Sequence, residues 1–164
     1  MVSRSIIKEM NLKVFPVGTV LVSCSADLGR CAVTARPLTT NQTFIGLFPK
    51  PGVSNLFIYY LMTFSAKRLN SLSSGTTIAY LSRDSFENFT ITIPSNLQEQ
   101  TKIAEILSTV DEKIENVAAQ IELTQQLKKG LMQRLLTKGI GHTKFKDSPL
   151  GEIPESWEVV KIVD

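Results

Sequence analysis

Residues 93–137 read IPSNLQEQTKIAEILSTVDEKIENVAAQIELTQQLKKGLMQRLLT, and this stretch decides the fold class of the chain. Apolar residues recur in it at alternating spacings of four and three, the heptad pattern of a helix that pairs with another helix. These seam residues are Ile103, Leu107, Val110, Ile114, Val117 and Ile121. The strict pattern fails at Thr124 and Lys128, after which a wider apolar stripe resumes that includes Leu131 and Leu135.

The ends of this helix carry their own signals. Ser95 and Gln98 have the spacing of a capping box, and Gly139 is suited to end the helix. A helix over residues 95–138 extends about 60 Å at a rise of about 1.5 Å per residue, too far to lie entirely across the preceding residues. Each Leu or Ile side chain that stays exposed lacks the stabilisation of about 1.5–3 kcal/mol that its burial would contribute. We therefore expect a partner helix, with a helix packed only on its own domain as the alternative.

Composition limits the class of protein. The chain has 164 residues, 43% hydrophobic and 20% charged, which is typical of a globular chain with one core. Its longest apolar run, Leu56–Met62, is too short to cross a membrane, and the N-terminus lacks the pattern of a signal peptide. Cys24 and Cys31 have no second cysteine pair nearby. We expect a cytoplasmic protein with reduced cysteines, no metal site and no cofactor.

Charge is distributed unevenly along the chain. Residues 1–97 contain nine Lys or Arg and four Asp or Glu, a net charge of +5. Residues 98–138 contain six of each sign, and residues 139–164 have a net charge of −2. A basic N-terminal region favours a polyanionic partner, because neutralised phosphates release their counterions.

The N-terminal region reads as mixed α and β. Its predicted strands cover residues 14–23, 30–35, 43–48, 76–81 and 86–93. Ser54 is expected to cap a helix over residues 55–69, whose core positions would be Leu56, Tyr59, Tyr60, Phe64 and Leu69. The predicted fold class is therefore α+β, a small mixed head followed by one long coiled-coil-type helix.

No catalytic constellation is present in the sequence. The phosphate-binding, metalloprotease and nucleophile-elbow motifs are missing, and the single His142 lies near the C-terminus. We therefore expect no enzymatic activity. The segment SSGTT at residues 73–77 is small and polar, and it suits either contacts to nucleic acid or an ordinary turn.

Several motifs resemble one known family. Leu97-Gln98-Glu99-Gln100 with Ile103-Ala104 resembles the signature that closes a target-recognition domain in the specificity subunits of type I restriction–modification enzymes. Leu131-Met132 and Leu135-Leu136-Thr137 resemble the end of the central helix in that family, and residues 151–159, GEIPESWEV, resemble the start of the next recognition domain. The likeness covers about residues 12–163.

The resemblance implies an organisation and a set of partners. Residues 1–94 would be a partial target-recognition domain, 95–138 the central spacer helix, and 139–164 a linker with the opening strand of a second recognition domain. The chain would be a non-catalytic half-subunit, split product or fragment that reads a half-site in double-stranded DNA and docks methyltransferase subunits. Two copies would pair their long helices antiparallel, as a homodimer, with Trp157 and Val159 of each tail adding an edge strand to the other head.

Within the head, polar and basic residues in loops are the candidates for contacts to DNA. Arginine and side-chain amides can bind base edges, whereas lysine mostly contacts phosphate. The candidates are Arg30, Asn41, Gln42, Lys50, Lys67, Arg68, Ser74, Thr76 and Thr77. The competing interpretation is a dimerisation and docking module, or a truncated remnant, without DNA specificity.

Overall fold

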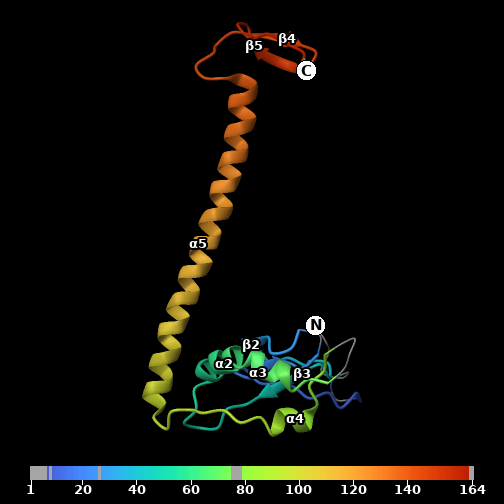
Figure 1. The fold of residues 1–164 in the computed structure, drawn as a ribbon, viewed down its shortest axis with the longest axis vertical. Helices are drawn as coiled ribbons and strands as arrows, with labels where there is room; N and C mark the ends of the chain where they lie inside the picture. Colours follow the sequence, from blue (N-terminus) through green and yellow to red (C-terminus); the bar gives the residue numbers. More distant parts are fainter. Residues whose placement is uncertain (1–6, 8, 26, 75–78, 163–164) are drawn as a thin grey trace. The chain divides into compact units, whose positions relative to one another are not determined.

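The computed structural model describes residue 7 and residues 9–25, 27–74 and 79–162, and these form two compact units. The first unit comprises residues 1–109, and the second comprises residues 110–164. The helix α5 (Leu97–Lys138) is continuous and contributes residues to both units (Figure 1). The α+β class predicted from sequence is confirmed.

A three-stranded antiparallel sheet organises the first unit. Its order is β2 (Cys31–Val33), β1 (Val20–Ser23), β3 (Phe44–Leu47), so that β1 is the central strand. Val20 pairs with Val33 on one side and with Leu47 on the other. All four residues of β1 are buried, as expected for an apolar strand covered on both sides.

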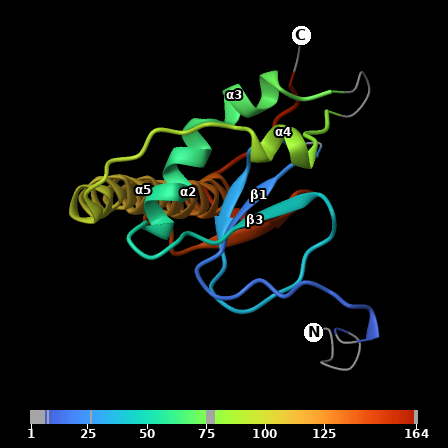
Figure 2. The same cartoon turned by 90° about the horizontal axis from the view of Figure 1, so that it is seen from below.

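Among the residues that the structure describes after the sheet, three short helices precede α5 in this unit. They are α2 (Asn55–Phe64), α3 (Ala66–Ser71) and α4 (Arg83–Glu87). The first of them, α2, packs against β1 and β2 (Figure 2). The predicted cap is confirmed, because the Ser54 hydroxyl accepts a hydrogen bond from Phe57 N at 3.3 Å. The core joins Val20 and Val22 of β1 to side chains from all three helices, including Met62, Leu69 and Phe86.

The predicted helix over 55–69 is interrupted, and its predicted core positions are confirmed only in part. Leu69 is buried and Tyr59 and Tyr60 pack against the core, whereas Leu56 and Phe64 are exposed. α2 ends at Phe64, and α3 begins one residue later. Phe57, Ile58 and Met62 are the buried residues of α2, whereas Phe64 is 85% exposed. The run LFIYYLM is apolar on every side, so periodicity alone does not show which face lies on the sheet.

The predicted strand over 86–93 is also wrong. Residues 83–87 form α4, and no strand is assigned over 88–93. The helix forms because the Ser82 hydroxyl accepts a hydrogen bond from Ser85 N at 3.0 Å. Arg83 Nε also donates to Glu87 Oε1 at 2.7 Å, one turn along the helix. Of the predicted strand over 76–81, only 79–81 is described, and Tyr80 there makes isolated bridges to Ser25 and Ser74.

Gln100 ties the first turns of α5 into the head. Its side chain is 1% exposed. Its Oε1 accepts a hydrogen bond from Ser54 N at 2.9 Å, and its Nε2 donates to Pro94 O at 2.8 Å. The helix starts at Leu97, one residue later than the predicted capping box required. Asn96, not Ser95, supplies the cap, since its Oδ1 accepts from Gln98 N at 2.8 Å.

The second unit contains the rest of α5 and a hairpin of β4 (Phe145–Ser148) and β5 (Gly151–Pro154). Gly139 ends α5 as predicted, with φ +64°, and its N–H donates to Leu135 O at 3.1 Å. Lys138 forms an ion pair with Glu152 and lies 4.7 Å from the centre of the Phe145 ring. These contacts join the hairpin to the end of the helix.

Trp157 lies against the end of its own helix. A methyl group added at Gly139 would approach Trp157 Cζ2 to 2.9 Å and His142 Cδ2 to 2.6 Å. The two rings of His142 and Trp157 meet edge to face, 6.1 Å apart. Residues 155–162 contain no strand in the single chain. The predicted edge strand of Trp157 and Val159 involves the head of a second copy and stays a prediction. None of the described helices is both long and apolar enough to cross a membrane.

Replacing the Gln100 amide tests the connection between α5 and the head. In Gln100→Glu, a carboxylate can accept from Ser54 N but cannot donate to Pro94 O. We expect a loss of about 1–3 kcal/mol in the free energy of unfolding at neutral pH, measured by urea denaturation. Burial raises the pKa of the new carboxyl, so acidification should reduce the loss, because a protonated carboxyl can donate to Pro94 O. Gln98→Glu, at an exposed site, is the control, and equal losses in both variants would contradict this role.

Two glycines of the second unit form a matched pair. Gly139→Ala places a side chain in a left-handed conformation and against Trp157, whereas the Cβ of Gly130→Ala meets nothing within 4 Å. Because Trp157 is the single tryptophan, its fluorescence reports the packing of the tail. We expect a red shift in Gly139→Ala and no shift in Gly130→Ala, which should gain about 1 kcal/mol of helix stability. An unchanged spectrum in Gly139→Ala would show that the tail does not pack as described.

Candidate nucleic-acid and helix-pairing surfaces

Three of the predicted cationic contacts to DNA are exposed in separate parts of the head. Arg30 lies just before β2 and forms an ion pair with Asp27. Lys50 lies in the loop between β3 and α2, and Lys67 lies in α3. All three side chains are exposed. Long, exposed basic side chains can reach phosphate without burying their charge.

The side chain of Arg68 contacts other residues of the head. Its Nη2 donates to Thr90 O at 3.4 Å, and its guanidinium lies 4.8 Å from the centre of the Phe89 ring. A cation–π contact of this kind restrains the side chain. Arg68 therefore contacts residues 89–90 of the same unit, which its position in the sequence did not indicate.

Asn41 and Gln42 lie in the loop before β3. The Oδ1 atom of Asn41 accepts hydrogen bonds from Thr43 N at 3.3 Å and from Thr43 Oγ1 at 2.6 Å. These bonds shape the turn. Ser74 is held by its backbone, which exchanges hydrogen bonds of 2.9 and 3.0 Å with Tyr80. Thr76 and Thr77 lie outside the described residues.

Gln42 lines a hollow of about 310 Å³ that brings together residues from distant parts of the chain. Two cations, Lys13 and Arg83, line the same hollow, together with the aromatic rings of Phe15, Phe44 and Tyr80. Lys13 Nζ lies 5.2 Å from the centre of the Phe15 ring. Glu87 accepts a hydrogen bond from Arg83, and this pairing raises the pKa of Arg83 above its ordinary value. Amide, cationic and aromatic groups are those that bind bases and phosphates.

Lys13 and Arg83 were missed by the sequence analysis. They are 70 positions apart, and neither lies in a recognisable motif. The fold brings them together, because residues 13–15 lie near β3 and α4 follows the bridge at Tyr80. No local signal in the sequence indicates this proximity.

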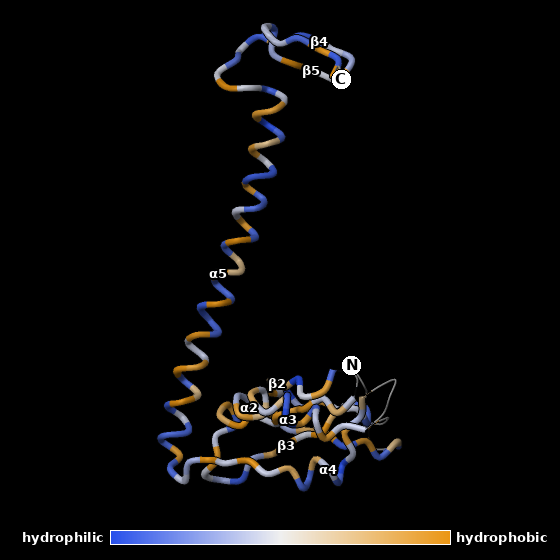
Figure 3. Tube along the Cα trace, in the orientation of Figure 1, coloured by the Kyte–Doolittle hydropathy of each residue, from blue (hydrophilic) through white to orange (hydrophobic). Residues whose placement is uncertain are grey.

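The predicted seam is a stripe of exposed apolar residues along α5. Val110, Ile114, Val117 and Ile121 are all exposed, with Ile114 at 61%. Ile103 alone among the seam residues packs against the core of the head. The alternation of apolar and polar segments along α5 is visible in Figure 3. Leu131 and Leu135 are exposed as well, so the stripe extends through the second unit.

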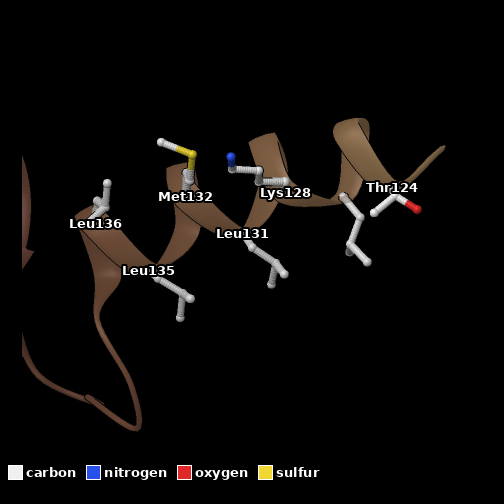
Figure 4. A pocket seen from close by; sticks show the side chains of 7 residues that line it. Thr124, Lys128, Leu131, Met132, Leu135 and Leu136 are labelled. Carbon is white, nitrogen blue, oxygen red and sulfur yellow. The ribbon is translucent and has the colours of Figure 1, made fainter. Parts of the chain in front are cut away.

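A shallow apolar hollow of about 370 Å³ lies on the C-terminal half of α5. Figure 4 shows Leu131 and Leu135 on one side of it and Lys128, Met132 and Leu136 on the other, with Thr124 at one end. These side chains form two ridges spaced four residues apart, the surface against which another helix packs.

Burial raises the pKa of both the Cys24 and the Cys31 thiols, which favours their protonated, unreactive form. Within the described residues, no three His, Cys, Asp or Glu side chains are grouped as metal ligands are.

Comparisons of the sequence and of the fold with known proteins identify the same family. Residues 1–125 match the family model described as the type I restriction modification DNA specificity domain. The chain is 33% identical over 172 residues to the Type I restriction enzyme MjaIX specificity subunit of Methanocaldococcus jannaschii, covering 99% of this chain and 39% of that protein. It is 42% identical over 111 residues to the MjaVIII specificity subunit of the same organism, covering 67% of this chain and 26% of that protein. The chain thus spans less than half the length of these relatives.

Solved structures show the same fold. The S subunit of a type I restriction–modification system from M. genitalium superposes with a TM-score of 0.62 at 27% identity, covering 76% of this chain and 33% of that chain. A structure titled for the complex assembly and conformational transition of the type I R-M system has a TM-score of 0.61 at 22% identity, which supports the fold alone. Since the family model matches about three quarters of the residues, this chain belongs to the family of type I restriction modification DNA specificity domains.

Proposed function

We propose that this chain is a non-catalytic DNA-specificity module of a type I restriction–modification system. Residues 1–94 read a half-site in double-stranded DNA, residues 95–138 form the spacer helix, and residues 139–164 open a second recognition domain. The observation that carries this proposal is the family match over residues 1–125 in a chain with an exposed apolar helix face. Methyl transfer and cleavage belong to partner subunits, which the assembled modules dock.

The second part of the proposal is a homodimer through antiparallel α5 helices. The exposed seam supports it, because several large apolar side chains lie in water along one face of the helix. Covering each of them contributes about 1.5–3 kcal/mol, before the entropy lost on association. A second copy supplies a face of matching pattern.

Light scattering tests this dimer directly. We expect a mass of about 36 kDa, twice the 18.2 kDa of one chain. Ile114→Asp places a charge in the middle of the seam and should return the mass to that of one chain, with the helix content retained by circular dichroism. Asn116→Asp introduces the same charge off the seam and should leave the dimer intact. A wild-type mass of 18.2 kDa across the concentration range would refute pairing between copies.

We infer two kinds of contact between the head and DNA, contacts to base edges and contacts to phosphates, and substitutions can distinguish them. We place Gln42 at base edges and Lys13, Lys50 and Lys67 at phosphates, because amides discriminate bases whereas lysines act as point charges. The net charge of +5 over residues 1–97 supports association with a polyanion.

Binding to duplex DNA at several salt concentrations checks both assignments. Lys50→Ala with Lys67→Ala should weaken binding to all sequences, and each lost contact should reduce the slope of log affinity against log salt by about 0.9. Gln42→Ala should instead reduce the preference for the cognate site by about 1–3 kcal/mol. Lys146→Ala, an exposed lysine of the tail, is the control for charge. Affinity that does not change with salt would count against the phosphate assignments.

A docking module without DNA specificity is the second candidate. It is favoured by the surface contacts of Arg30 with Asp27 and of Arg68 with Phe89, which pair two predicted DNA contacts with other residues of the head. Binding to a methyltransferase subunit with no binding to duplex DNA would support this candidate over the first.

A further inference from the structure

The charges of α5 are sorted by sign along its length. Residues 97–117 carry five acidic and two basic side chains, a net charge of −3. Residues 118–138 carry one acidic and four basic side chains, a net charge of +3. Two such helices in parallel bring like charges together, whereas an antiparallel pair sets each half beside the half of opposite sign. The helix is therefore complementary to a reversed copy of itself.

The seam is also symmetric about its own centre once Thr124 and Lys128 are counted as seam positions. One antiparallel alignment places every seam position of one copy opposite a seam position of the other. In this alignment the numbers of two facing residues add to 238. The facing pairs are Leu107 with Leu131, Val110 with Lys128, Ile114 with Thr124, Val117 with Ile121, and, at the end of the seam, Leu135 with Ile103, which also packs against its own head. A slip of one heptad in either direction leaves two seam positions of each copy without a facing residue.

We propose that two copies of this chain pair in this one register, and that Lys128 selects it. The inference rests on the dimer proposed above and adds its alignment. Lys128 faces Val110 of the second copy, so its ammonium group extends past the seam toward the acidic pair Asp111 and Glu112. In one slipped register Lys128 faces Ile103, whose neighbours within two positions, Lys102 and Glu105, cancel in charge. In the other it faces Val117, which has one acidic neighbour at that distance, Glu115, against two beside Val110. A lysine within an apolar seam lowers stability but specifies register.

The shape of the helix surface fits the same alignment. The hollow between residues 124 and 136 would receive the partner's residues 102–114, which include the exposed Leu107 and Ile114. The short Thr124 faces the larger Ile114, so a small side chain is matched to a large one. Thr124 is one of the residues that line this hollow, and Figure 4 places it at one end.

Mixed-cysteine cross-linking of full-length chains reads the register. Full-length Val117→Cys mixed with full-length Ile121→Cys should form a disulfide-linked dimer at least about tenfold faster than either variant alone. A parallel dimer would instead link each variant to itself and overturn the proposal. Faster linking of Val110→Cys or of Thr124→Cys with Ile121→Cys would show a slipped register. Cys24 and Cys31, whose thiol pKa values are raised, should contribute little, and the unmodified chain measures their background.

Replacing Lys128 tests its role in selection. Lys128→Leu should tighten the dimer and weaken the preference for this register, which the matched seam ends then maintain without the lysine, so that the rate of the Val117–Ile121 pair relative to the two slipped pairs falls at least about threefold. Lys129→Leu, one position off the seam, should keep the wild-type preference. An unchanged preference in Lys128→Leu would overturn the role of Lys128. A wild-type mass of one chain would refute the dimer itself, whereas a dimer with slipped cross-links would refute only the register.

Discussion

The buried amide of Gln100 is the contact on which the relation between the head and α5 depends. One side chain satisfies Ser54 N, at the start of α2, and Pro94 O, just before α5, and it is 1% exposed. A glutamine can do this because it both donates and accepts, whereas a charged carboxylate only accepts. Ala104, also buried, lies one turn further along the same helix. The first turns of α5 therefore belong to the core of the head, although most of the helix is exposed.

Local patterns in the sequence predicted the long helix well and the head less well. The seam of α5 and the glycine at its end are properties of short stretches, so Val110, Ile121 and Gly139 could be assigned from spacing alone. The buried face of α2 could not be assigned, because its run is apolar all round and the sheet decides which side is covered. Phe86 was placed in a strand, since its helix is a single turn made by a cap and one ion pair.

For the candidate contacts to DNA, exposure could also be predicted from the residue type, whereas proximity in the fold could not. Exposure of Arg30, Lys50 and Lys67 follows from their charge and could be predicted. That Gln42 shares a hollow with Lys13 and Arg83 depends on how the strands pair, which no stretch of a few residues encodes. The contact of Arg68 with the ring of Phe89, 21 positions later in the chain, likewise depends on the fold and could not be predicted from charge.

The range of the hydrogen bonds has a consequence for the order of folding. Every bond along α5 joins residues about one turn apart, whereas the head is closed by contacts such as Ser54 with Gln100, 46 positions apart. Helices of this kind form within about a microsecond, and non-local sheets take far longer because a loop must close first. The apolar face of α5 is therefore exposed before the head is complete. In the proposed homodimer, two chains refolding from denaturant would therefore meet through their helices while their heads are still folding, so that assembly and folding would overlap in time.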